Sequence, residues 1–229
     1  MSNNATPAIE STALGRRYGR RWALVDLSFA IPRGAVAMLT GHNGSGKSTL
    51  LRVLATALRP DRGQARVQGY DVSTQRLEAQ RSVALLGHHL YLYEALTALE
   101  NLQLVARFVP MSAERETLVE RLDQVGLAQR ADDPVASFSA GMRKRVALAR
   151  LLLQPALVLL LDEPYGELDP AGFRLVDELL ARLRAEGRTV LMATHLVERG
   201  RELCDFTLAL EAGRLVYAGP TAQAPRNHS

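Results

Sequence analysis

The sequence predicts an α/β protein with a parallel-sheet core, an antiparallel β part towards the N-terminus and an inserted α-helical subdomain. Three observations support this fold class. Short apolar runs of strand length alternate with segments of helical spacing, which is typical of a doubly wound parallel sheet. A glycine-rich loop stands between a strand-like and a helix-like segment, and a long helical stretch interrupts the alternation.

The first half of the chain supplies the antiparallel part and the start of the core. A tight turn at Pro32–Gly34 separates two strands, and the apolar run before Gly41 is bounded by glycine, as a buried strand would be. In chain order, we expect strands at 23–31, 35–40, 66–70 and 83–86, and a helix at 49–58.

The second half begins with helices and returns to the sheet. Apolar residues recur at helical spacing after residue 95, with a break at Asp132–Pro134. The apolar run before Asp162 fits a strand that is buried on both faces. We expect helices within 95–153, including one at 143–153, another helix at 173–186, strands at 157–161 and 189–193, and a hairpin of 206–210 and 214–217.

These elements predict a single domain over residues 8–220, a length that suits one large α/β domain. Its core comprises about 8–87 and 151–220, and its helical subdomain about 88–150. The polar residues 221–229 are expected to form a flexible tail.

Composition narrows the classes of function. The chain is 47% apolar and 23% charged with a net charge of +4, which is ordinary for a globular protein and suits an anionic ligand or membrane surface. It has no run of five or more like charges, so no nucleic-acid partner is expected. Cys204 is the one cysteine, so no internal disulfide can form, and a buried, inert thiol is expected.

Neither a secretory signal nor a membrane span is expected. The first fifteen residues lack a basic start followed by an apolar stretch. The longest apolar region, 151–161, is interrupted by Gln154 and Pro155, whereas a span needs roughly 20 apolar residues. Any membrane role is therefore expected to come through a partner.

The strongest motif is a phosphate-binding loop between the strand at 35–40 and the helix at 49–58. Glycines let the backbone curl so that its N–H groups point at phosphate oxygens, and the helix N-terminus adds its dipole. Lys47 would neutralise the β- and γ-phosphates, and the Ser48 hydroxyl would ligate Mg²⁺. The alternative is a glycine turn without a ligand. The pattern G-x-x-x-x-G-K-[ST] is matched by Gly41, His42, Asn43, Gly44, Ser45, Gly46, Lys47 and Ser48, and Thr49 follows.

A second motif is the acidic pair Asp162 and Glu163 at the end of a buried strand. Burying carboxylates is costly, so a chemical role is expected. Asp162 would hold Mg²⁺ through water, and Glu163 would polarise the attacking water as general base. A solvated cap is the alternative, but the position after a phosphate loop favours catalysis.

A third motif surrounds Ser139, which is a good N-cap for the helix that follows. Its hydroxyl, the exposed backbone N–H groups and the helix dipole together make a second anion site. Taken alone, the segment is better interpreted as a capped helix with a basic first turn.

The phosphate loop, Phe138–Met142, Leu159–Pro164 and His195 follow one another in an order that resembles an ABC transporter ATPase over about residues 8–220. The resemblance implies a P-loop NTPase (RecA-like) core, ATP and Mg²⁺ as cofactors, and a head-to-tail homodimer with ATP at the seam. It also implies an integral membrane transporter subunit as partner and a peripheral location on the cytoplasmic face of the cell membrane.

The resemblance implies roles for single residues. Tyr18 resembles the aromatic residue that stacks on adenine, with a core tyrosine as the alternative. Ser139 and Gly141 occupy the signature-loop positions that contact the γ-phosphate held by the other subunit. The usual Leu-Ser-Gly-Gly-Gln is altered at Phe138, Ala140 and Met142.

Two further positions follow the same resemblance. Asp169 matches a loop that lines the dimer seam, although Gly166 and Glu167 depart from its usual residues. His195 matches the switch histidine that contacts the γ-phosphate and would act with Glu163 and Lys47 in catalysis. A structural strand-end histidine is the alternative for His195.

His88 stands where the family commonly has a glutamine that senses Mg²⁺ and the membrane partner. An imidazole can still approach a metal-bound water. Together with Leu96–Leu102 and Arg145–Leu151, the Gly87-His88 pair resembles the ATPase subunit of the cytochrome c maturation haem exporter. Haem is then implied as cargo that this chain does not bind, because the sequence has no Cys-x-x-Cys-His.

The expected function is therefore ATP hydrolysis that powers the haem exporter of cytochrome c biogenesis. One alternative is the ATPase of another exporter, for a drug, lipid or polysaccharide. A second is a soluble ABC protein without a transport role, and a third is a P-loop kinase or GTPase. The signature segment and His195 speak against the third, because neither would be needed there.

Overall fold

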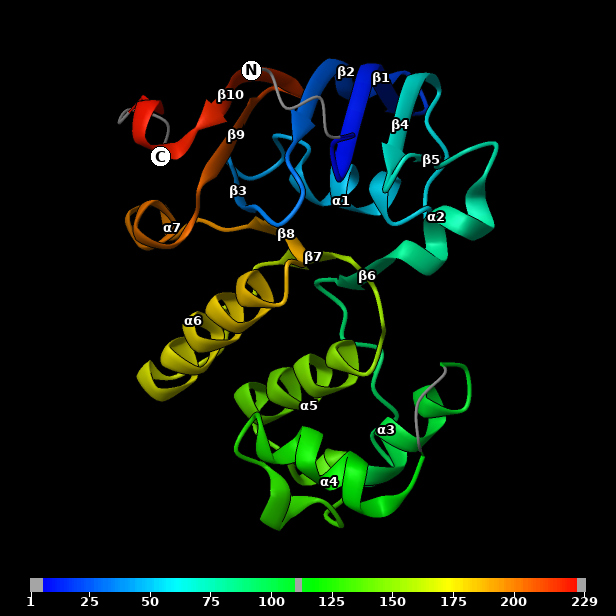
Figure 1. Cartoon of the computed structure of the whole chain (residues 1–229), viewed down its shortest axis with the longest axis vertical. Coiled ribbons are helices and arrows are strands. Elements are labelled where there is room, and N and C mark those ends of the chain that lie inside the picture. Colours follow the sequence, from blue (N-terminus) through cyan, green and yellow to red (C-terminus); the bar gives the residue numbers. More distant parts are fainter. Residues whose placement is uncertain (1–5, 110–112, 226–229) are drawn as a thin grey trace. The chain divides into compact units, whose positions relative to one another are not determined.

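The computed structural model describes residues 6–109 and 113–225, and the chain divides into two compact units (Figure 1). The predicted helical subdomain, 88–150, lies within the second unit. The first unit contains the residues up to Gly87, Ala156–Glu163 and the residues from Leu179 onwards, and the second contains His88–Pro155 and Pro164–Glu178.

An antiparallel sheet in the first unit confirms the predicted antiparallel part. Its strands pair in the order β2-β1-β4-β5. The chain turns at Gln68 and Gly69, both at positive φ, so the single strand predicted at 66–70 is two strands. The four strands are β1 (Ile9–Tyr18), β2 (Arg21–Ile31), β4 (Arg62–Val67) and β5 (Tyr70–Asp71).

A six-stranded sheet forms the predicted core of the same unit, in the order β10-β9-β3-β8-β7-β6. Its pairs are parallel except for the β9–β10 hairpin. Every residue of β3, β7 and β8 is buried, as their continuous apolar runs predicted. The strands are β3 (Val36–Thr40), β6 (Val83–Leu86), β7 (Val158–Asp162), β8 (Thr189–Ala193), β9 (Phe206–Glu211) and β10 (Arg214–Pro220).

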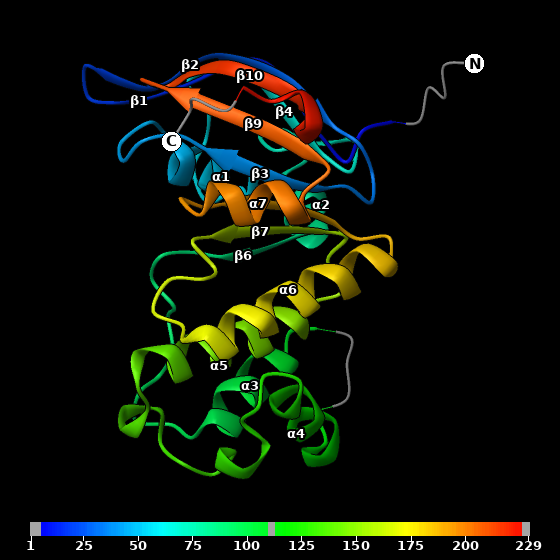
Figure 2. The ribbon, with the colours of Figure 1, turned by 90° about the vertical axis from the view of Figure 1, so that its left-hand side faces the viewer.

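Three short helices belong to the first unit. The helix α1 (Lys47–Leu54) contacts β2 and β4 of one sheet and β6 and β7 of the other. It ends four residues earlier than predicted, and Thr56 just beyond it has a left-handed φ of 60°. The sequence did not predict α2 (Arg76–Ser82) or α7 (Val197–Leu203), which packs on β3 (Figure 2).

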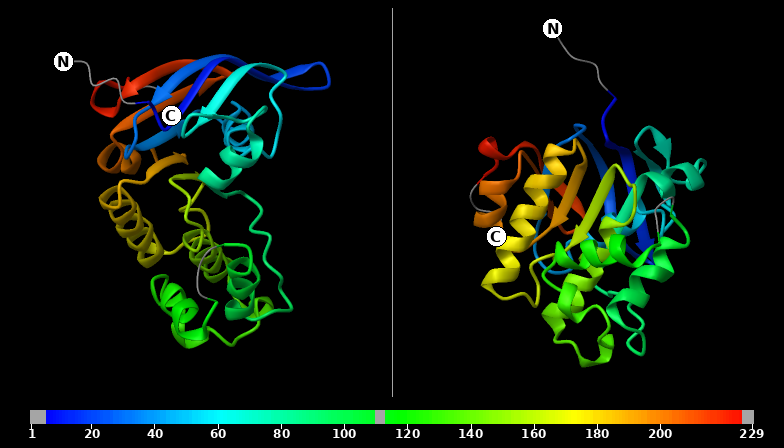
Figure 3. Two further views of the ribbon diagram at one scale, coloured as in Figure 1. Left: turned by 45° about the vertical axis from the view of Figure 1, so that its right-hand side comes forward. Right: turned by 60° about the horizontal axis from the view of Figure 1, so that its bottom comes forward.

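The second unit is helical (Figure 3), as predicted for 95–153, and this stretch contains several short elements. A capping box of Thr97 and Glu100 starts the first helix, and the N-cap Ser139 starts the last. None of the helices in the described ranges is long and apolar enough to cross a membrane. The elements are α3 (Ala98–Ala106), α4 (Arg115–Asp123), the 3-10 turns η1 (Ala128–Arg130) and η2 (Val135–Ser137), and α5 (Ala140–Leu152).

The helix α6 (Pro170–Ala185) runs from the second unit into the first. It begins three residues before the predicted start at Phe173. Asp169 accepts a hydrogen bond from the Gly172 N–H (2.8 Å), and a proline in the first helical position suits such a start.

The predicted tail of 221–229 begins with a 3-10 turn, η3 (Thr221–Gln223). The hydroxyls of Thr207 and Thr221 lie 3.0 Å apart, and both side chains are buried. The last four residues of the predicted tail, 226–229, lie outside the described residues.

Candidate functional site

Three glycines shape the loop between β3 and α1. Gly41, Gly44 and Gly46 have φ values of 139°, 81° and 108°, a region that residues with a side chain rarely adopt. A Cβ at Gly41 would lie 2.2 Å from the carbonyl oxygen of Leu210, and one at Gly46 would lie 2.6 Å from that of Ala23. Neighbouring backbone thus passes too close for a side chain at either position.

Lys47 opens α1 with its amine folded back over this loop. Its Nζ donates to the carbonyl oxygens of Gly41 (2.6 Å) and His42 (3.1 Å), and the residue is only 9% exposed. The hydroxyl of Ser45 is buried, and no hydrogen-bond partner for it exists in the described part of the chain. A cation, an unsatisfied hydroxyl and a helix start without acidic residues together fit a triphosphate.

The parallel strands bring the other predicted groups of the first unit to the same edge. Leu39 of β3 pairs with Ala193 of β8, and Ala193 pairs with Asp162 of β7. The phosphate loop, Glu163 and His195 directly follow these strands, so all of them lie at the carboxyl edge of the sheet. Parallel α/β proteins bind their ligands at this edge.

Glu163 and His195 form a pair at that edge. Nδ1 of His195 lies 2.8 Å from Oε2 of Glu163, within hydrogen-bond distance. Glu163 has a φ of +49°, which is strained for a residue with a side chain, and its own N–H donates to Ala193 (2.9 Å). The side chain of His195 is 70% exposed, so an incoming substrate can reach the pair.

Ser48 and Asp162 are the oxygen groups predicted to hold a cation. Ser48 is exposed on the first turn of α1, whereas Asp162 is 6% exposed at the end of β7. A hydroxyl and a carboxylate are ligands that Mg²⁺ accepts. Their residue types and their place beside the phosphate loop fit the ion.

Tyr18, the last residue of β1, does not lie in the core. It is 48% exposed, and the guanidinium of Arg16 lies 5.3 Å from the centre of its ring in a cation–π contact. An exposed, supported ring is suited to stacking on a nucleobase.

Ser139 and Gly141 stand at the start of α5 in the second unit. The Ser139 hydroxyl accepts a hydrogen bond from the Met142 N–H (3.2 Å), so this serine is the predicted N-cap. A Cβ at Gly141 would lie 2.8 Å from the carbonyl oxygen of Glu167, so only glycine allows the loop at 166–169 to approach the helix this closely.

A hollow of about 530 Å³ adjoins this helix start, and its walls include Ser139, Gly141 and Asp169. Nη2 of Arg145 donates to Oδ1 of Asp169 over 2.9 Å. The hydrogen bond from Gly172 is the main reason that the pKa of Asp169 is lowered, and Arg145 adds to this effect. Asp169 is therefore held as an anion between α5 and the start of α6.

His88 lies in the second unit, whereas Ser48 and Asp162 lie in the first. It is exposed, packs edge to face with His89 at 5.5 Å between ring centres, and borders a hollow of about 420 Å³. Within the described ranges, no group of three or more His, Cys, Asp or Glu side chains could hold a metal ion. A metal-sensing role for His88 stays a prediction.

Comparison with known proteins identifies the family. The family model described as "ABC transporter" matches residues 24–166, which include the phosphate loop, the Ser139 segment and the Asp162–Glu163 pair. The chain belongs to the ABC transporter family. Within this family it is an ATP-binding subunit with the ATPase domain.

Relatives support this assignment along almost the whole chain. A daunorubicin resistance ATP-binding protein of Streptomyces coeruleorubidus is 38% identical over 94% of this chain and 69% of its own length. A Nod factor export ATP-binding protein of Ralstonia nicotianae is 35% identical over 94% of this chain and 68% of its own. A dimeric ATP-binding cassette, solved in a post-hydrolysis state with ADP and Pi, has a TM-score of 0.84 at 25% identity and covers 93% of this chain and 98% of that one.

These relatives do not support the expected haem-exporter subfamily. Their names are those of drug-resistance and Nod factor export proteins, which favours the alternative of another exporter. The three short segments that carried this resemblance, Gly87–His88, Leu96–Leu102 and Arg145–Leu151, were too short to fix the cargo.

Two supporting residues of these sites were not predicted. Arg145 anchors Asp169, and Asp61 binds Arg16 beside Tyr18. Their partners are 24 and 45 residues away in sequence, so no local spacing indicated either contact.

Proposed function

We propose that this chain binds and hydrolyses ATP to power a separate membrane subunit of an ABC exporter. The observation that carries the proposal is the shared sheet edge of a lysine-bearing glycine loop and a Glu–His pair. Phosphoryl transfer needs positioning and charge stabilisation more than covalent chemistry, and groups fixed on one sheet supply both.

The loop at 41–49 would hold the phosphates of ATP. Lys47 exchanges its contacts with the loop carbonyls for the β- and γ-phosphates, and the free hydroxyl of Ser45 becomes a donor. Ser48 and, through water, Asp162 would hold Mg²⁺, which supplies neutralisation of phosphate charge. The ring of Tyr18 stacks on the adenine.

Glu163 acts as the general base that polarises the attacking water. Its contact with the His195 N–H fixes the direction of the carboxylate, and His195 is then placed to meet the γ-phosphate. Proton transfer by a positioned carboxylate contributes about 10²- to 10⁴-fold to a rate. The strained φ of Glu163 fits a residue whose position is set by function.

A second copy of the chain would complete each site. The N-terminus of α5, with Ser139 as its N-cap and Gly141 in its first turn, faces the γ-phosphate held by the other copy. The related cassette is dimeric, which supports a homodimer; the head-to-tail arrangement is part of this proposal. ATP binding closes this dimer, and hydrolysis reopens it.

The partner is an integral membrane subunit. This chain binds it at the cytoplasmic face of the cell membrane. Among exporters, one for a drug-like or other organic molecule is favoured, because the related proteins are named for drug resistance and Nod factor export. A haem-handling complex is the less favoured candidate.

Lys47→Ala tests this function, with Arg81→Ala on the exposed end of α2 as a matched loss of one cation in the same unit. Lys47→Ala should bind ATP weakly and release no phosphate above background, whereas Arg81→Ala should equal the unaltered chain in both assays. Retained turnover in Lys47→Ala would rule out the phosphate-loop assignment. Affinity purification of the tagged chain from solubilised membranes should also recover an integral membrane protein, and recovery of soluble chain alone would exclude the transport role.

A further inference from the structure

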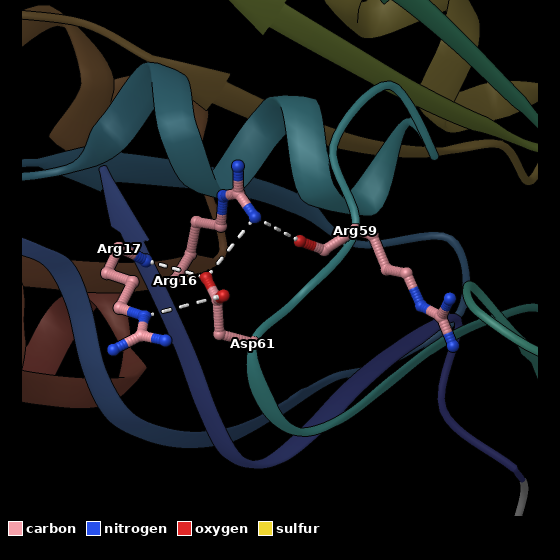
Figure 4. A network of polar contacts seen from close by, with 4 residues as sticks. All are labelled: Arg16, Arg17, Arg59 and Asp61. Carbon is pink, nitrogen blue, oxygen red and sulfur yellow. Dashed lines mark hydrogen bonds and ion pairs between the residues drawn. The ribbon is translucent and has the colours of Figure 1, made fainter. Parts of the chain in front are cut away.

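Asp61, just before β4, is the centre of a polar network with Arg16, Arg17 and Arg59 (Figure 4). Arg16 and Arg17 directly precede Tyr18, the residue predicted to stack on adenine. Its Oδ2 accepts hydrogen bonds from the backbone N–H of Arg17 (2.9 Å) and from Nη1 of Arg16 (3.2 Å). Its Oδ1 lies 3.7 Å from Nε of Arg17. One carboxylate thus contacts two consecutive residues immediately before Tyr18.

The polar contacts of Asp61 lie beyond the last backbone pair between β1 and β4. The ladder between β1 and β4 stops at the pair of Gly15 and Arg62, so the last three residues of β1 have no partner on β4. The Asp61 N–H donates to the Gly15 carbonyl (2.8 Å), and its carboxylate receives the Arg17 N–H. The side chain of Asp61 thereby substitutes for the missing strand and fixes the end of β1.

Arg16 links Asp61 to the ring of Tyr18, because its guanidinium contacts both. Its Nη1 is held by the Asp61 carboxylate and by the Arg59 carbonyl (3.0 Å). With the guanidinium fixed at two acceptors, it lies over one face of the exposed ring, 5.3 Å from its centre. The ring as a whole is 48% exposed, so a stacking partner can reach it.

We propose that Asp61 is a positioning residue for the purine base of the nucleotide, acting through Arg16 and the backbone of Arg17 on the ring of Tyr18. The inference rests on the proposed function, in which Tyr18 stacks on adenine. It assigns to Asp61 the pre-ordering of that ring, so that less conformational freedom is lost when the base binds.

The charge state of Asp61 suits this role. The hydrogen bond from the Arg17 N–H is the main reason that its pKa is lowered, and the charges of Arg16 and Arg17 lower it further. The carboxylate is therefore ionised at neutral pH and accepts all of these bonds. An amide in its place would offer one acceptor oxygen and two N–H groups that face cations.

Asp61→Asn tests the inference by a comparison of two ligands, ATP and inorganic tripolyphosphate, which has no base. Asp61→Asn should raise the dissociation constant for ATP about threefold to tenfold, the effect of one hydrogen bond, and leave that for tripolyphosphate unchanged. The turnover number at saturating ATP should also stay unchanged. Asp71→Asn is the matched control, since Asp71 accepts backbone N–H bonds in the same sheet but none from β1.

Tyr18→Ala separates this inference from the proposed function. It should weaken ATP about tenfold or more and spare tripolyphosphate, as expected for loss of a stacked base. If Tyr18→Ala weakens ATP while Asp61→Asn does not, the positioning role of Asp61 is overturned and the adenine site stands. If Tyr18→Ala leaves ATP binding intact, the adenine assignment fails and the inference fails with it.

A second variant covers the case that Asp61→Asn does not fold. Arg16→Met keeps an unbranched, flexible side chain but removes the guanidinium with its contacts to Asp61, the Arg59 carbonyl and the Tyr18 ring. It should show the same loss for ATP alone. In the double variant, the two losses should be less than additive, because both changes act on one network. Full additivity, or equal weakening of ATP and tripolyphosphate, would contradict a role in base positioning.

Discussion

At the scale of single residues, Cys204 is the clearest case of a group whose chemistry is suppressed by its surroundings. It follows α7 and is 6% exposed. Burial raises the pKa of its thiol to about 12, from an ordinary value of 9.0. The nucleophilic thiolate is therefore almost absent at neutral pH, which agrees with the inert thiol expected from the sequence.

Thiol labelling checks this prediction, and the one cysteine makes the signal unambiguous. At pH 8 the native chain should react with iodoacetamide far more slowly than the chain unfolded in denaturant. Because the raised pKa favours the unfolded state above pH 9, the free energy of unfolding should fall as the pH rises through that value. Cys204→Ser should lose this alkaline contribution, and rapid labelling of the native chain would contradict the burial of the thiol.

Glu163 shows at the same scale why part of the site escaped sequence reasoning. Its proposed catalytic role was predicted from its place after a buried strand and a phosphate loop. Its contact with His195 does not, because 32 residues separate the two and only the β7–β8 pairing brings them together. Its positive φ likewise leaves no mark in the sequence.

At the scale of elements, the junction of α5 and α6 depends on Asp169 in two ways. Its carboxylate caps α6 through the Gly172 N–H and pairs with Arg145 of α5. Three variants separate these contributions. Asp169→Ala loses both, Asp169→Ser keeps a capping hydroxyl but loses the charge, and Arg145→Leu loses the pair alone.

Thermal unfolding should rank these variants. Asp169→Ala should have the lowest midpoint, because the N-cap is lost with the ion pair. Asp169→Ser and Arg145→Leu should lie close to the unaltered chain, since a solvent-exposed pair contributes little. A midpoint for Arg145→Leu as low as that for Asp169→Ala would show that the pair, and not the cap, dominates this junction.

Elements could be predicted from the sequence where a single local pattern, such as an apolar run, determined them. Continuous apolar runs located β3, β7 and β8, because strands buried on both faces leave no polar alternation. The break at Asp132–Pro134 was predicted from its proline, whereas the other boundaries between 95 and 153 were not, since apolar spacing continues across turns such as the one at Gly126. The helices α2 and α7, each of seven residues, are too short for their periodicity to stand out.

At the scale of the whole molecule, the proposed mechanism requires two copies of the chain. Glu163→Gln keeps the size and the hydrogen-bonding oxygen of the side chain but removes the general base. We expect it to bind ATP, to lower turnover by about 10²-fold or more, and to accumulate dimers. The reason is that hydrolysis, the step that reopens the dimer, is blocked.

Sedimentation with and without ATP measures this outcome. Glu78→Gln on the exposed face of α2 is the matched control and should behave as the unaltered chain. Adding Ser139→Ala to Glu163→Gln should reduce the dimer fraction, because the second copy loses its contact with the γ-phosphate. A Glu163→Gln chain that stays monomeric with saturating ATP would exclude the two-copy site.

The hairpin that carries Tyr18 also carries Trp22, the one tryptophan of the chain, which pairs with Arg17 across the two strands. Its ring lies 5.8 Å and 5.0 Å from the guanidinium groups of Arg17 and Arg62. Indole emission responds to nearby charge, so Trp22 is an intrinsic optical reporter on the hairpin that carries the proposed adenine-stacking residue. If Tyr18 stacks on adenine as proposed, binding of ATP should change this emission and can be followed in real time without a dye or an engineered label.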